Sequence, residues 1–478
     1  MNRLNLSSAR GLLTTATALV FFSGLFTSST FAQFGQNTPE PRREQLLNGL
    51  NVLLSHRPGD SQAMLKLRIH SGAAFDLEDK DGLMALLGDM LFPDPATRQY
   101  VTGDLAGRLE VTTTFDAITI TLIGRAGEFE RLAEIMRNAL VTQQITDDSL
   151  QRLRDARIKT ARELNLAPET IADRAAARRL YGTYPYGRSV SGSPETLSRI
   201  DRTDLLRARE RFFNPNNATL VYAGGVELSR VRRTLRQFLG VWRKSERVVP
   251  ATFRQPETPD ARALIVNFAG MPGAEVRLSA RGLALTDRDV TGANVLSLLA
   301  HARWLAAVPE LKGSAVSVRH DGYALGGVFR MSASVSSPLT AAKALEAARG
   351  ILQSLLAAPP SAADLETAKR ESLALLNREQ EKPDAATDAW LDAQIYNRTT
   401  ADVARAVSAL TPADVGHVAA KLFREAPIAS VVVGDAAKLR DDVARVGPIE
   451  VMSVEAMSEA KPKAEVPKQT PGVQIKRP

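Results

Sequence analysis

The stretch IDRTDLLRARERFFNPNNATLVYAGG, residues 200–225, returns as a pattern in LTPADVGHVAAKLFREAPIASVVVGD, residues 410–435. Three matched pairs stand 210 residues apart: Asp204 and Asp414, Phe213 and Phe423, Gly224 and Gly434. Chance pairing of common helix–turn–strand sequences is the alternative, but three matches at one offset favour a duplication. The chain is therefore predicted to contain two related domains.

The beginning of each half supports this prediction. NVLLSHRPGDSQAMLKLRI (51–69) and ALIVNFAGMPGAEVRLSARGL (263–283) each place a Pro-Gly pair between two strand-like runs. Pro and Gly in sequence are typical of a turn, because proline fixes φ and glycine accepts positive φ. Each half thus begins with two strands joined by a turn.

Strand-like and helix-like segments are mixed within each half. LEVTTTFDAITITLI (109–123) is rich in β-branched residues and partly alternates, whereas 129–140, 149–164 and 169–181 repeat apolar residues at i, i+3 and i+4. The segments do not alternate regularly as βαβ units. We therefore expect an α+β fold, with an antiparallel sheet packed against helices, rather than a doubly wound sheet.

The domain boundaries follow from composition. Residues 244–261 (KSERVVPATFRQPETPDA) carry charges and three prolines with little apolar periodicity, as expected of a linker. The first domain is predicted at 40–243 and the second at 262–447. The Lys- and Pro-rich end, 448–478, is predicted to be a disordered tail.

The first 32 residues have the layout of a secretory signal peptide. Arg3 and Arg10 are followed by an apolar stretch at 11–26, and small residues at 30 and 32 precede Gln33. A transmembrane anchor is the competing interpretation, but this apolar stretch is shorter than the ~20 residues needed to span a bilayer. We expect an exported, periplasmic protein with no membrane anchor after cleavage.

Composition excludes several classes of site. The 478 residues are 44% hydrophobic and 24% charged with formal charge +8, which is ordinary for globular domains. The absence of cysteine rules out thiolate zinc sites, iron–sulfur clusters, disulfides and cysteine nucleophiles. The five histidines, at 56, 70, 301, 320 and 417, never stand three to five residues apart, so none forms a local zinc pair. Nucleophile-elbow, phosphate-loop and dinucleotide-binding motifs are also missing.

Three segments together resemble the M16 metallopeptidases, the family of insulinase, pitrilysin and the mitochondrial processing peptidases. They are SGAAFDLEDKDGLMALLGDMLF (71–92), the Thr-rich strand at 111–121, and the stretch 177–225 containing YPYG. The likeness covers about residues 40–440 and is greatest to the bacterial two-domain M16B branch. It implies a clamshell of two homologous domains, the LuxS/MPP-like metallohydrolase fold.

The family's zinc motif is lost in this chain. Active members carry His-x-x-Glu-His on one helix, where two imidazoles bind Zn²⁺ and the Glu is the general base. The corresponding positions here are Ala85, Gly88 and Asp89, and the family's third ligand, a later Glu, falls on Thr160. Glu163 lies one turn further on, and as a shifted ligand it would have only Asp89 as a second ligand. The resemblance therefore implies no metal site and no cofactor in this chain.

The family's second catalytic element is lost as well. In active members an Arg and a Tyr seven residues apart hold the substrate carbonyl and its developing oxyanion. Here these positions carry Pro309 and Val316, which have no side-chain donor. The resemblance thus implies no catalytic residue in this chain.

What the resemblance leaves intact is the scaffold. Family members add a substrate peptide as an extra strand to an edge of the first sheet, a mode that uses main-chain groups. The matching stretch is EVTTTFDA: Glu110, Val111, Thr112, Thr113, Thr114, Phe115, Asp116 and Ala117. The alternative is an ordinary strand that is already paired or covered.

Basic residues recur on the predicted helices of the first half, among them Arg157, Arg174 and Arg179. A solvated helix face explains them better than an acidic partner does. No recognition motif accompanies the charge, so we expect no nucleic-acid partner.

These observations favour a non-catalytic subunit of a periplasmic M16-type zinc metallopeptidase complex. It would pair, as a heterodimer or larger assembly, with a zinc-bearing M16 chain and help to enclose peptide substrates. The alternative is a stand-alone peptide-binding or chaperone-like protein without proteolysis. A third hypothesis, an active hydrolase with an unrecognised site, would need peptide cleavage that survives Asp89→Ala and chelator.

Overall fold

The computed structural model describes residues 40–246, 253, 256–425 and 428–459. The predicted signal peptide, 1–32, much of the predicted linker and the end from 460 onward lie outside these residues. Among the helices within the described ranges, none combines the length and apolarity needed to cross a bilayer.

The first domain is a six-stranded sheet in the order β1-β2-β6-β3-β5-β4. Its strands are β1 (Arg42–Gln45), β2 (Asn51–His56), β3 (Gln62–Ile69), β4 (Arg108–Thr113), β5 (Ile118–Arg125) and β6 (Ala218–Gly224). Its helical segments are η1 (Ala73–Phe75), α1 (Leu83–Asp89), α2 (Pro95–Gly103), η2 (Ala126–Glu128), α3 (Phe129–Arg137), η3 (Asn138–Thr142), α4 (Asp147–Leu164), α5 (Pro168–Tyr181), η4 (Pro185–Gly187), α6 (Pro194–Ser198), α7 (Arg202–Phe212), η5 (Pro215–Asn217) and α8 (Leu228–Leu239).

The second domain is a six-stranded sheet in the order β12-β7-β11-β8-β10-β9. Its strands are β7 (Ala263–Asn267), β8 (Ala274–Gly282), β9 (Ala315–Gly322), β10 (Gly327–Val335), β11 (Ile428–Gly434) and β12 (Ile449–Ser453). Its helices are α9 (Val290–Ala307), η6 (Pro309–Leu311), α10 (Pro338–Ala357), α11 (Ala362–Gln380), α12 (Ala385–Tyr396), α13 (Thr400–Ala409), α14 (Pro412–Phe423), α15 (Ala436–Val446) and α16 (Val454–Glu459).

The predicted duplication is confirmed. Strands β2 to β6 of the first sheet correspond in chain order and position to β7 to β11 of the second. The 210-residue offset holds at the level of elements, since β6 begins at Ala218 and β11 at Ile428. The helices before them, α7 and α14, both begin with a capping box, in which Asp204 and Asp414 occupy the third helical position.

The α+β fold class is also confirmed, but the sheets are mixed rather than wholly antiparallel. β6 runs parallel to β2, and β11 runs parallel to β7. Each of these strands enters the centre of its sheet after a helix, and such a crossover connection allows parallel pairing.

The predicted disordered tail begins too early. Residues 449–453 form β12, which pairs in parallel with β7, and α16 follows it. The segment IEVMS supplies β-branched residues and an edge position beside Ile265, so it extends the sheet despite the polar sequence that comes next.

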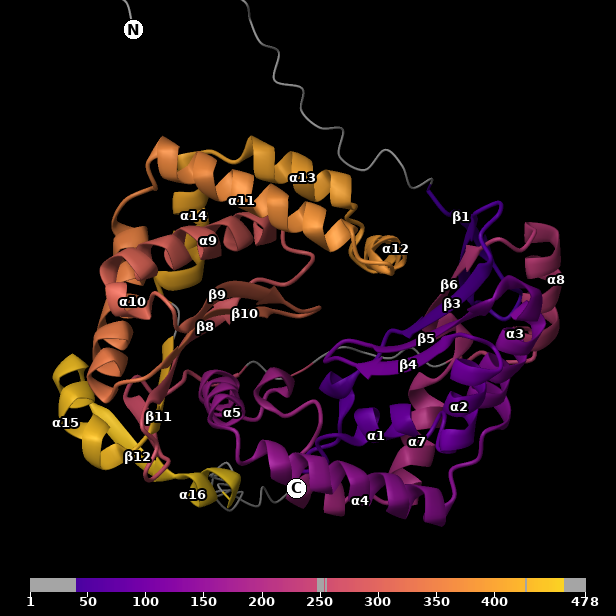
Figure 1. Ribbon diagram of the computed structural model, residues 1–478, viewed down its shortest axis with the longest axis horizontal. Coiled ribbons are helices and arrows are strands. Elements are labelled where there is room, and N and C mark those ends of the chain that lie inside the picture. Colours follow the sequence, from indigo (N-terminus) through magenta and orange to yellow (C-terminus); the bar gives the residue numbers. More distant parts are fainter. Residues whose placement is uncertain (1–39, 247–252, 254–255, 426–427, 460–478) are drawn as a thin grey trace, which may run out of the picture.

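Each sheet has one face in its own domain's core. In Figure 1, α3 and α8 cover the outer face of the first sheet, while α9, α10 and α14 lie on the far side of the second. Phe129, Tyr222 and Leu65 are buried in the first core, and Trp304 and Phe329 in the second. The two remaining sheet faces are turned toward each other across the molecule (Figure 1).

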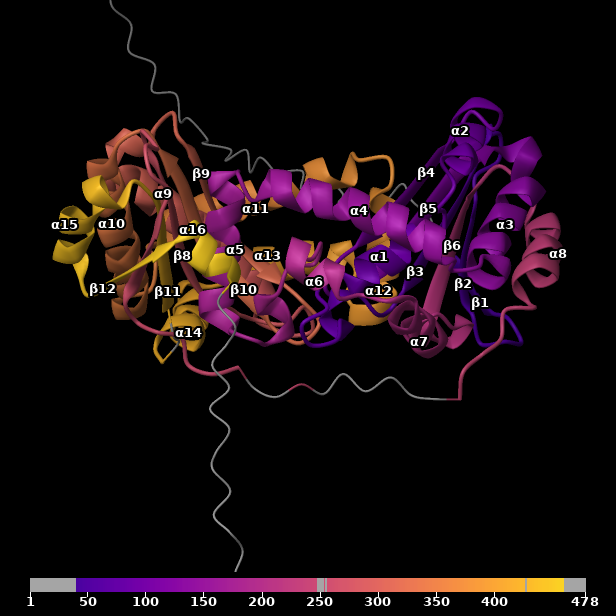
Figure 2. The ribbon, with the colours of Figure 1, turned by 90° about the horizontal axis from the view of Figure 1, so that it is seen from below.

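Each half sends one helix to the inner face of the other half's sheet. α5, from the first half of the sequence, packs Ile171 and Ala175 against Val431 of β11. α12, from the second half, packs Leu391 against Val221 of β6. Figures 1 and 2 both show α5 against the second domain and α12 reaching toward the first.

A cation from the middle of each inner face pairs with an aspartate of the crossing helix. Lys66 of β3 lies 2.6 Å from Asp388 of α12, and Arg277 of β8 lies 2.6 Å from Asp173 of α5. The two cations occupy equivalent places, because Lys66 pairs with Val221 and Arg277 with Val431, 210 residues later. The ion pairs are therefore part of the duplicated design.

Candidate functional site

Helix α1 is anchored by a buried carboxylate that precedes it. The backbone N–H groups of Gly82 and Met84 each donate to Asp76 at 2.7 Å, which satisfies two of the free donors of the first helical turn. Gly82 has φ 93°, and a Cβ there would lie 2.9 Å from Gly192, so glycine lets this loop approach the helix closely. Burial raises the pKa of Asp76 to about 7.

The zinc-motif positions of α1 face packed protein. Ala85 is 2% exposed, and Gly88 is also buried. A Cβ added at Gly88 would lie 3.2 Å from Thr113 Oγ1 and 3.3 Å from Val111 Cγ1. α1 thus lies directly against β4, and neither position offers a ligand atom.

The third position, Asp89, is engaged by an arginine that sequence analysis did not connect with it. Arg157 of α4 donates from Nε to Asp89 Oδ2 at 2.5 Å and from Nη2 to Asp89 Oδ1 at 3.0 Å. Its Nη2 also donates to the carbonyl of Ala85 at 3.0 Å. A bidentate guanidinium therefore occupies both carboxylate oxygens at the place of the zinc motif.

The remaining candidate ligands do not complete a metal site. Thr160 lines the same cavity as Asp89, but its hydroxyl donates to the carbonyl of Ala156 in its own helix. Glu163 is exposed and is not among the residues that line the cavity. Within the described ranges, no three His, Asp or Glu side chains are arranged to hold a metal ion. The residues present do not fit zinc.

Arg157 could have been noticed in the sequence. It falls at an inward position of α4, between Leu153 and Ala161, where an apolar residue is expected. Our interpretation of it as part of a solvated face is wrong, since only 24% of its side chain is exposed. The same holds for Arg179 of α5, whose side chain is 9% exposed and pairs with Glu450 at 2.6 Å.

The positions of the lost Arg and Tyr lie in the second domain. Pro309 is exposed at the start of η6, and Val316 lies in β9, the edge strand of the second sheet. The Val316 side chain packs against the second core. The structure therefore gives neither position a side-chain group that could assist an oxyanion.

The predicted peptide-binding stretch divides into two parts. Glu110, Val111, Thr112 and Thr113 belong to β4, which ends the first sheet and pairs with β5. Thr114 pairs with Ala117 across the turn, so by antiparallel alternation the N–H and C=O groups of Val111 and Thr113 point away from β5. This short edge could take another strand.

The second part, 114–117, forms a joint between the domains instead of an edge strand. The N–H of Ala324, in the β9–β10 turn, donates to Asp116 at 2.9 Å. Phe115 contacts Tyr323 and Tyr186, with ring centroids 5.2 Å apart in both pairs. We correct the prediction for Thr114, Phe115, Asp116 and Ala117, because turn geometry and aromatic packing remove these four residues from the strand.

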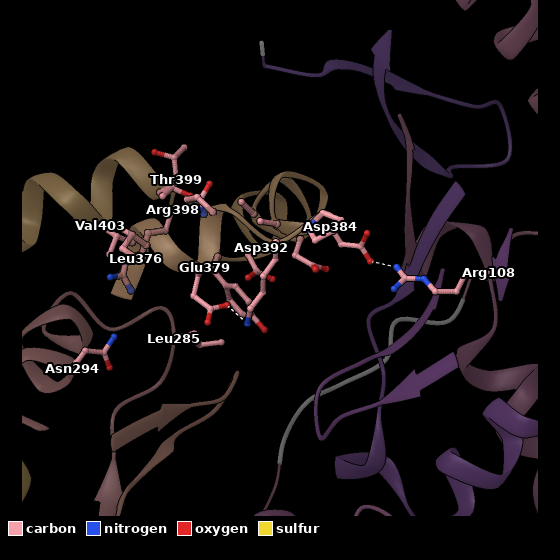
Figure 3. Close-up of a pocket in the computed structure, with 18 residues that line it drawn as sticks. Arg108, Leu285, Asn294, Leu376, Glu379, Asp384, Asp392, Arg398, Thr399 and Val403 are labelled. Carbon is pink, nitrogen blue, oxygen red and sulfur yellow. Dashed lines mark hydrogen bonds and ion pairs between the residues drawn. The ribbon is translucent and has the colours of Figure 1, made fainter. Parts of the chain in front are cut away.

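A cavity of about 650 Å³ lies beside the start of β4, between it and α11, α12 and α13. Figure 3 shows Asp384, just before α12, bonded across this space to Arg108 of β4. Lys66 and Arg68 bind the next acids along the helix, with Arg68 2.5 Å from Asp392. Ion pairs from β3 and from the start of β4 thus hold α12 to the inner face of the first sheet.

A second cavity, of about 490 Å³, lies between α4, α5 and the loop 187–192, with Asp89 in its wall. The histidines do not contribute to it or to any shared site. Burial lowers the pKa of both His70 and His320 to about 4, so both are neutral at pH 7.

Part of the chain matches the model of a peptidase family, and named relatives match about half of the chain. Residues 199–372 match the family model described as the peptidase M16 inactive domain. Subunit 1 of the mouse mitochondrial cytochrome b-c1 complex is 24% identical over 216 residues, 44% of this chain and 45% of that protein. The beta subunit of the mitochondrial processing peptidase of Neurospora crassa is 20% identical over 251 residues, 51% of this chain and 53% of that protein. The chain thus spans about half the length of these curated relatives.

A solved structure shows the same fold over both domains. The crystal structure of a protease from Helicobacter pylori superimposes with a TM-score of 0.75 and 16% identity, covering 83% of this chain and 99% of that one. At this identity the likeness shows the two-domain α+β fold.

Proposed function

We propose that this chain, whose residues 199–372 match the peptidase M16 inactive domain, is the non-catalytic subunit of an M16-type zinc peptidase complex. It pairs with a related chain that carries the zinc motif, and together they enclose peptides. This chain contributes part of the wall of the peptide chamber and the edge strand β4, and it holds no zinc itself. This chain reaches the periplasm through its own signal peptide at 1–32, and the complex forms there.

One observation carries the proposal: the bidentate contact of Arg157 with Asp89. A chain that had merely lost its ligands would leave the Asp89 carboxylate without a fixed partner. Here the Arg157 guanidinium holds both carboxylate oxygens and also donates to the α1 backbone at Ala85, which supports a non-catalytic role for this helix. Meanwhile the two domains and the β4 edge are intact.

The names of the relatives are consistent with work in assemblies. The mouse protein is a subunit of the cytochrome b-c1 complex, and the Neurospora protein is a subunit of a processing peptidase. Both names describe chains that function beside other chains. This supports pairing of the present chain without identifying its partner.

The test is purification of the tagged full-length chain from its own cells under gentle conditions. We expect an M16 chain with an intact His-x-x-Glu-His motif to co-purify in fixed ratio, and chelator-sensitive peptide cleavage to require both chains. N-terminal sequencing should begin at Gln33 if the signal is cleaved. A monomer in the native extract, with no zinc-bearing M16 chain bound, would contradict the proposal.

The second candidate is stand-alone peptide binding without proteolysis. It is favoured by the exposed edge of β4, which is present in a single chain and needs only main-chain groups of a ligand. Calorimetry of the isolated chain with unfolded peptides separates the two. A subunit that depends on its partner binds weakly alone, whereas a chaperone-like protein binds at full strength.

A further inference from the structure

The cavity of about 490 Å³ beside α1 is rich in arginine. It lies where the zinc motif faces α4, and it is walled by α4, α5 and the loop 187–192. Its charged lining residues are Asp89, Arg157, Asp173, Arg174 and Arg188. Three cations therefore face two acids.

Both acids are already matched by arginines other than Arg174 and Arg188. Asp89 is bound on both oxygens by Arg157. Asp173 lies 2.6 Å from Arg277 and is therefore held by the second sheet. Neither acid pairs with Arg174 or Arg188, and Arg188 has a different acid, Asp81, 3.6 Å away.

The side chain of Arg188, a residue of the loop 187–192, is held by several contacts. It donates to the carbonyls of Asp76 at 3.0 Å and Ala74 at 3.3 Å, and it lies 3.6 Å from Asp81. Its Nε is buried and has no hydrogen-bond partner in the described part of the chain. Arg188 thus adds positive potential to the cavity from a rigid position.

Arg174 has no such acid. Its Nη1 donates to Asn165 Oδ1 at 2.5 Å. Glu195 raises the pKa of Arg174 from a distance, but within the described ranges no carboxylate lies within ion-pair distance of it. Burial lowers the pKa of Arg174, because removal from water disfavours the cation. An anionic ligand would relieve this cost, and a carboxylate matches the two-pronged geometry of a guanidinium.

We propose that this cavity binds a carboxylate of a peptide, with Arg174 as its main contact. A peptide is favoured over a free small anion because the cavity adjoins the edge strand. Asp89 lies in its wall, and the neighbouring Gly88 lies against Val111 and Thr113 of β4. A chain added to β4 would therefore pass the cavity. The place that lost its metal has become a site for acidic groups.

The inference does not need a partner subunit, so the two proposals fail separately. Without a partner in the cell, the cavity can still select carboxylates. Without selection of carboxylates, the chain can still pair with an M16 subunit.

The experiment is calorimetric titration of the full mature chain with three matched unstructured peptides of ten residues. One carries a central Glu and an amidated C-terminus, the second replaces Glu with Gln, and the third is the Gln peptide with a free C-terminal carboxylate. We expect at least one acidic peptide to bind about 10-fold tighter than the neutral one, because only a carboxylate can accept charge-assisted hydrogen bonds from both prongs of Arg174. The arm that gains affinity shows whether a side chain or the C-terminus enters.

The matched variants are Arg174→Gln and Arg162→Gln. Arg162 is exposed on α4 and does not line the cavity, so its loss removes the same charge elsewhere. Arg174→Gln should abolish the preference, and Arg162→Gln should leave it within about twofold. Arg174→Lys, which keeps the charge but not the fork, should retain part of it.

Three results would overturn the inference. The first is equal affinity of the wild-type chain for all three peptides, and the second is an acidic preference that persists in Arg174→Gln. The third is displacement of all three peptides alike by inorganic phosphate, which would indicate a site for a free anion. The first and third use only the wild-type chain and hold even if a variant fails to fold.

Discussion

Asp388→Asn should release helix α12 from the first sheet. Asp388 is the nearest acid to Lys66, whose side chain is 4% exposed, and the next acid, Asp384, is 3.8 Å away. Without the Asp388 charge, Lys66 is left buried with a weaker partner. The chain can avoid this cost by letting α12 move away, which returns Lys66 to water.

The size of the effect follows from what else holds α12. Its apolar contact centres on Leu391, which is fully buried and contributes about 1.5–3 kcal/mol. The charge-assisted contact of Asp388 contributes a similar amount, and the 45% exposure of Asp388 puts its share near the lower end, about 1.5 kcal/mol. The undocked population should therefore rise about 10-fold.

The assay uses the absence of cysteine from the chain. Thr387→Cys places one thiol at a position of α12 that is 1% exposed, one turn before Leu391. The rate of thiol labelling then reports undocking, and adding Asp388→Asn should raise it about 10-fold. Exposed Glu371→Gln on α11 removes the same charge at a distance and should leave the rate unchanged.

The duplicated position provides the second control. Asp173→Asn in a chain carrying Ala175→Cys should change labelling less than about twofold. α5 remains docked through buried Ile171 and Ala176, and Arg277 keeps Glu275 at 2.9 Å. Equal labelling with and without Asp388→Asn, or faster labelling at Ala175→Cys than at Thr387→Cys, would refute the reasoning.

Three other perturbations have defined outcomes. Purified chain should contain no stoichiometric zinc by elemental analysis, and chelator should leave its thermal unfolding temperature unchanged; zinc held at 85–89 would contradict this. Arg157→Ala should lower the free energy of unfolding by about 1–3 kcal/mol in urea titrations, because Asp89 loses its bidentate partner. Arg157→Lys should lower it by less, since the charge remains. Equal losses in the two variants would contradict a stabilising role for the Arg157 charge. Burial lowers the pKa of His320 to about 4, below the unfolded value, so its stabilising contribution is present above about pH 6.5 and is lost as pH falls toward 4, by about 2–3 kcal/mol. His320→Gln should remove this part of the dependence of the unfolding free energy on pH, measured in urea. The raised pKa of Asp76 changes the unfolding free energy in the opposite direction over the same pH range. An unchanged pH dependence in the variant would exclude His320 as its source.

The fold could be predicted because duplication is visible in sequence at fixed spacing. The turn-forming Pro-Gly pairs, the helix before β6 and the strand itself all recur, and local sequence determines each of them. The exchange of α5 and α12 could not be predicted in this way. The apolar residues of α5 form only a weak face and those of α12 almost none, and periodicity does not show which sheet buries a face.

Sequence alone shows that Ala85 and Gly88 carry no ligand atom in any fold. What replaced the ligands depends on a contact between residues 89 and 157, far apart in sequence. Composition showed the many arginines but not which of them face inward. The helical position of Arg157, between Leu153 and Ala161, marks it as inward, but only the packing of α4 on α1 shows that its partner is Asp89.

The crossed helices bear on how the two halves can exist apart. A half-length fragment would leave an ionisable group and an apolar strip of its sheet facing water. The crossing helix, or arm, that should cover them would belong to the other fragment. Two such fragments, mixed, should reassemble by trading arms, much as a domain-swapped dimer does. The covalent join turns that encounter into an intramolecular one at an effective concentration in the millimolar range.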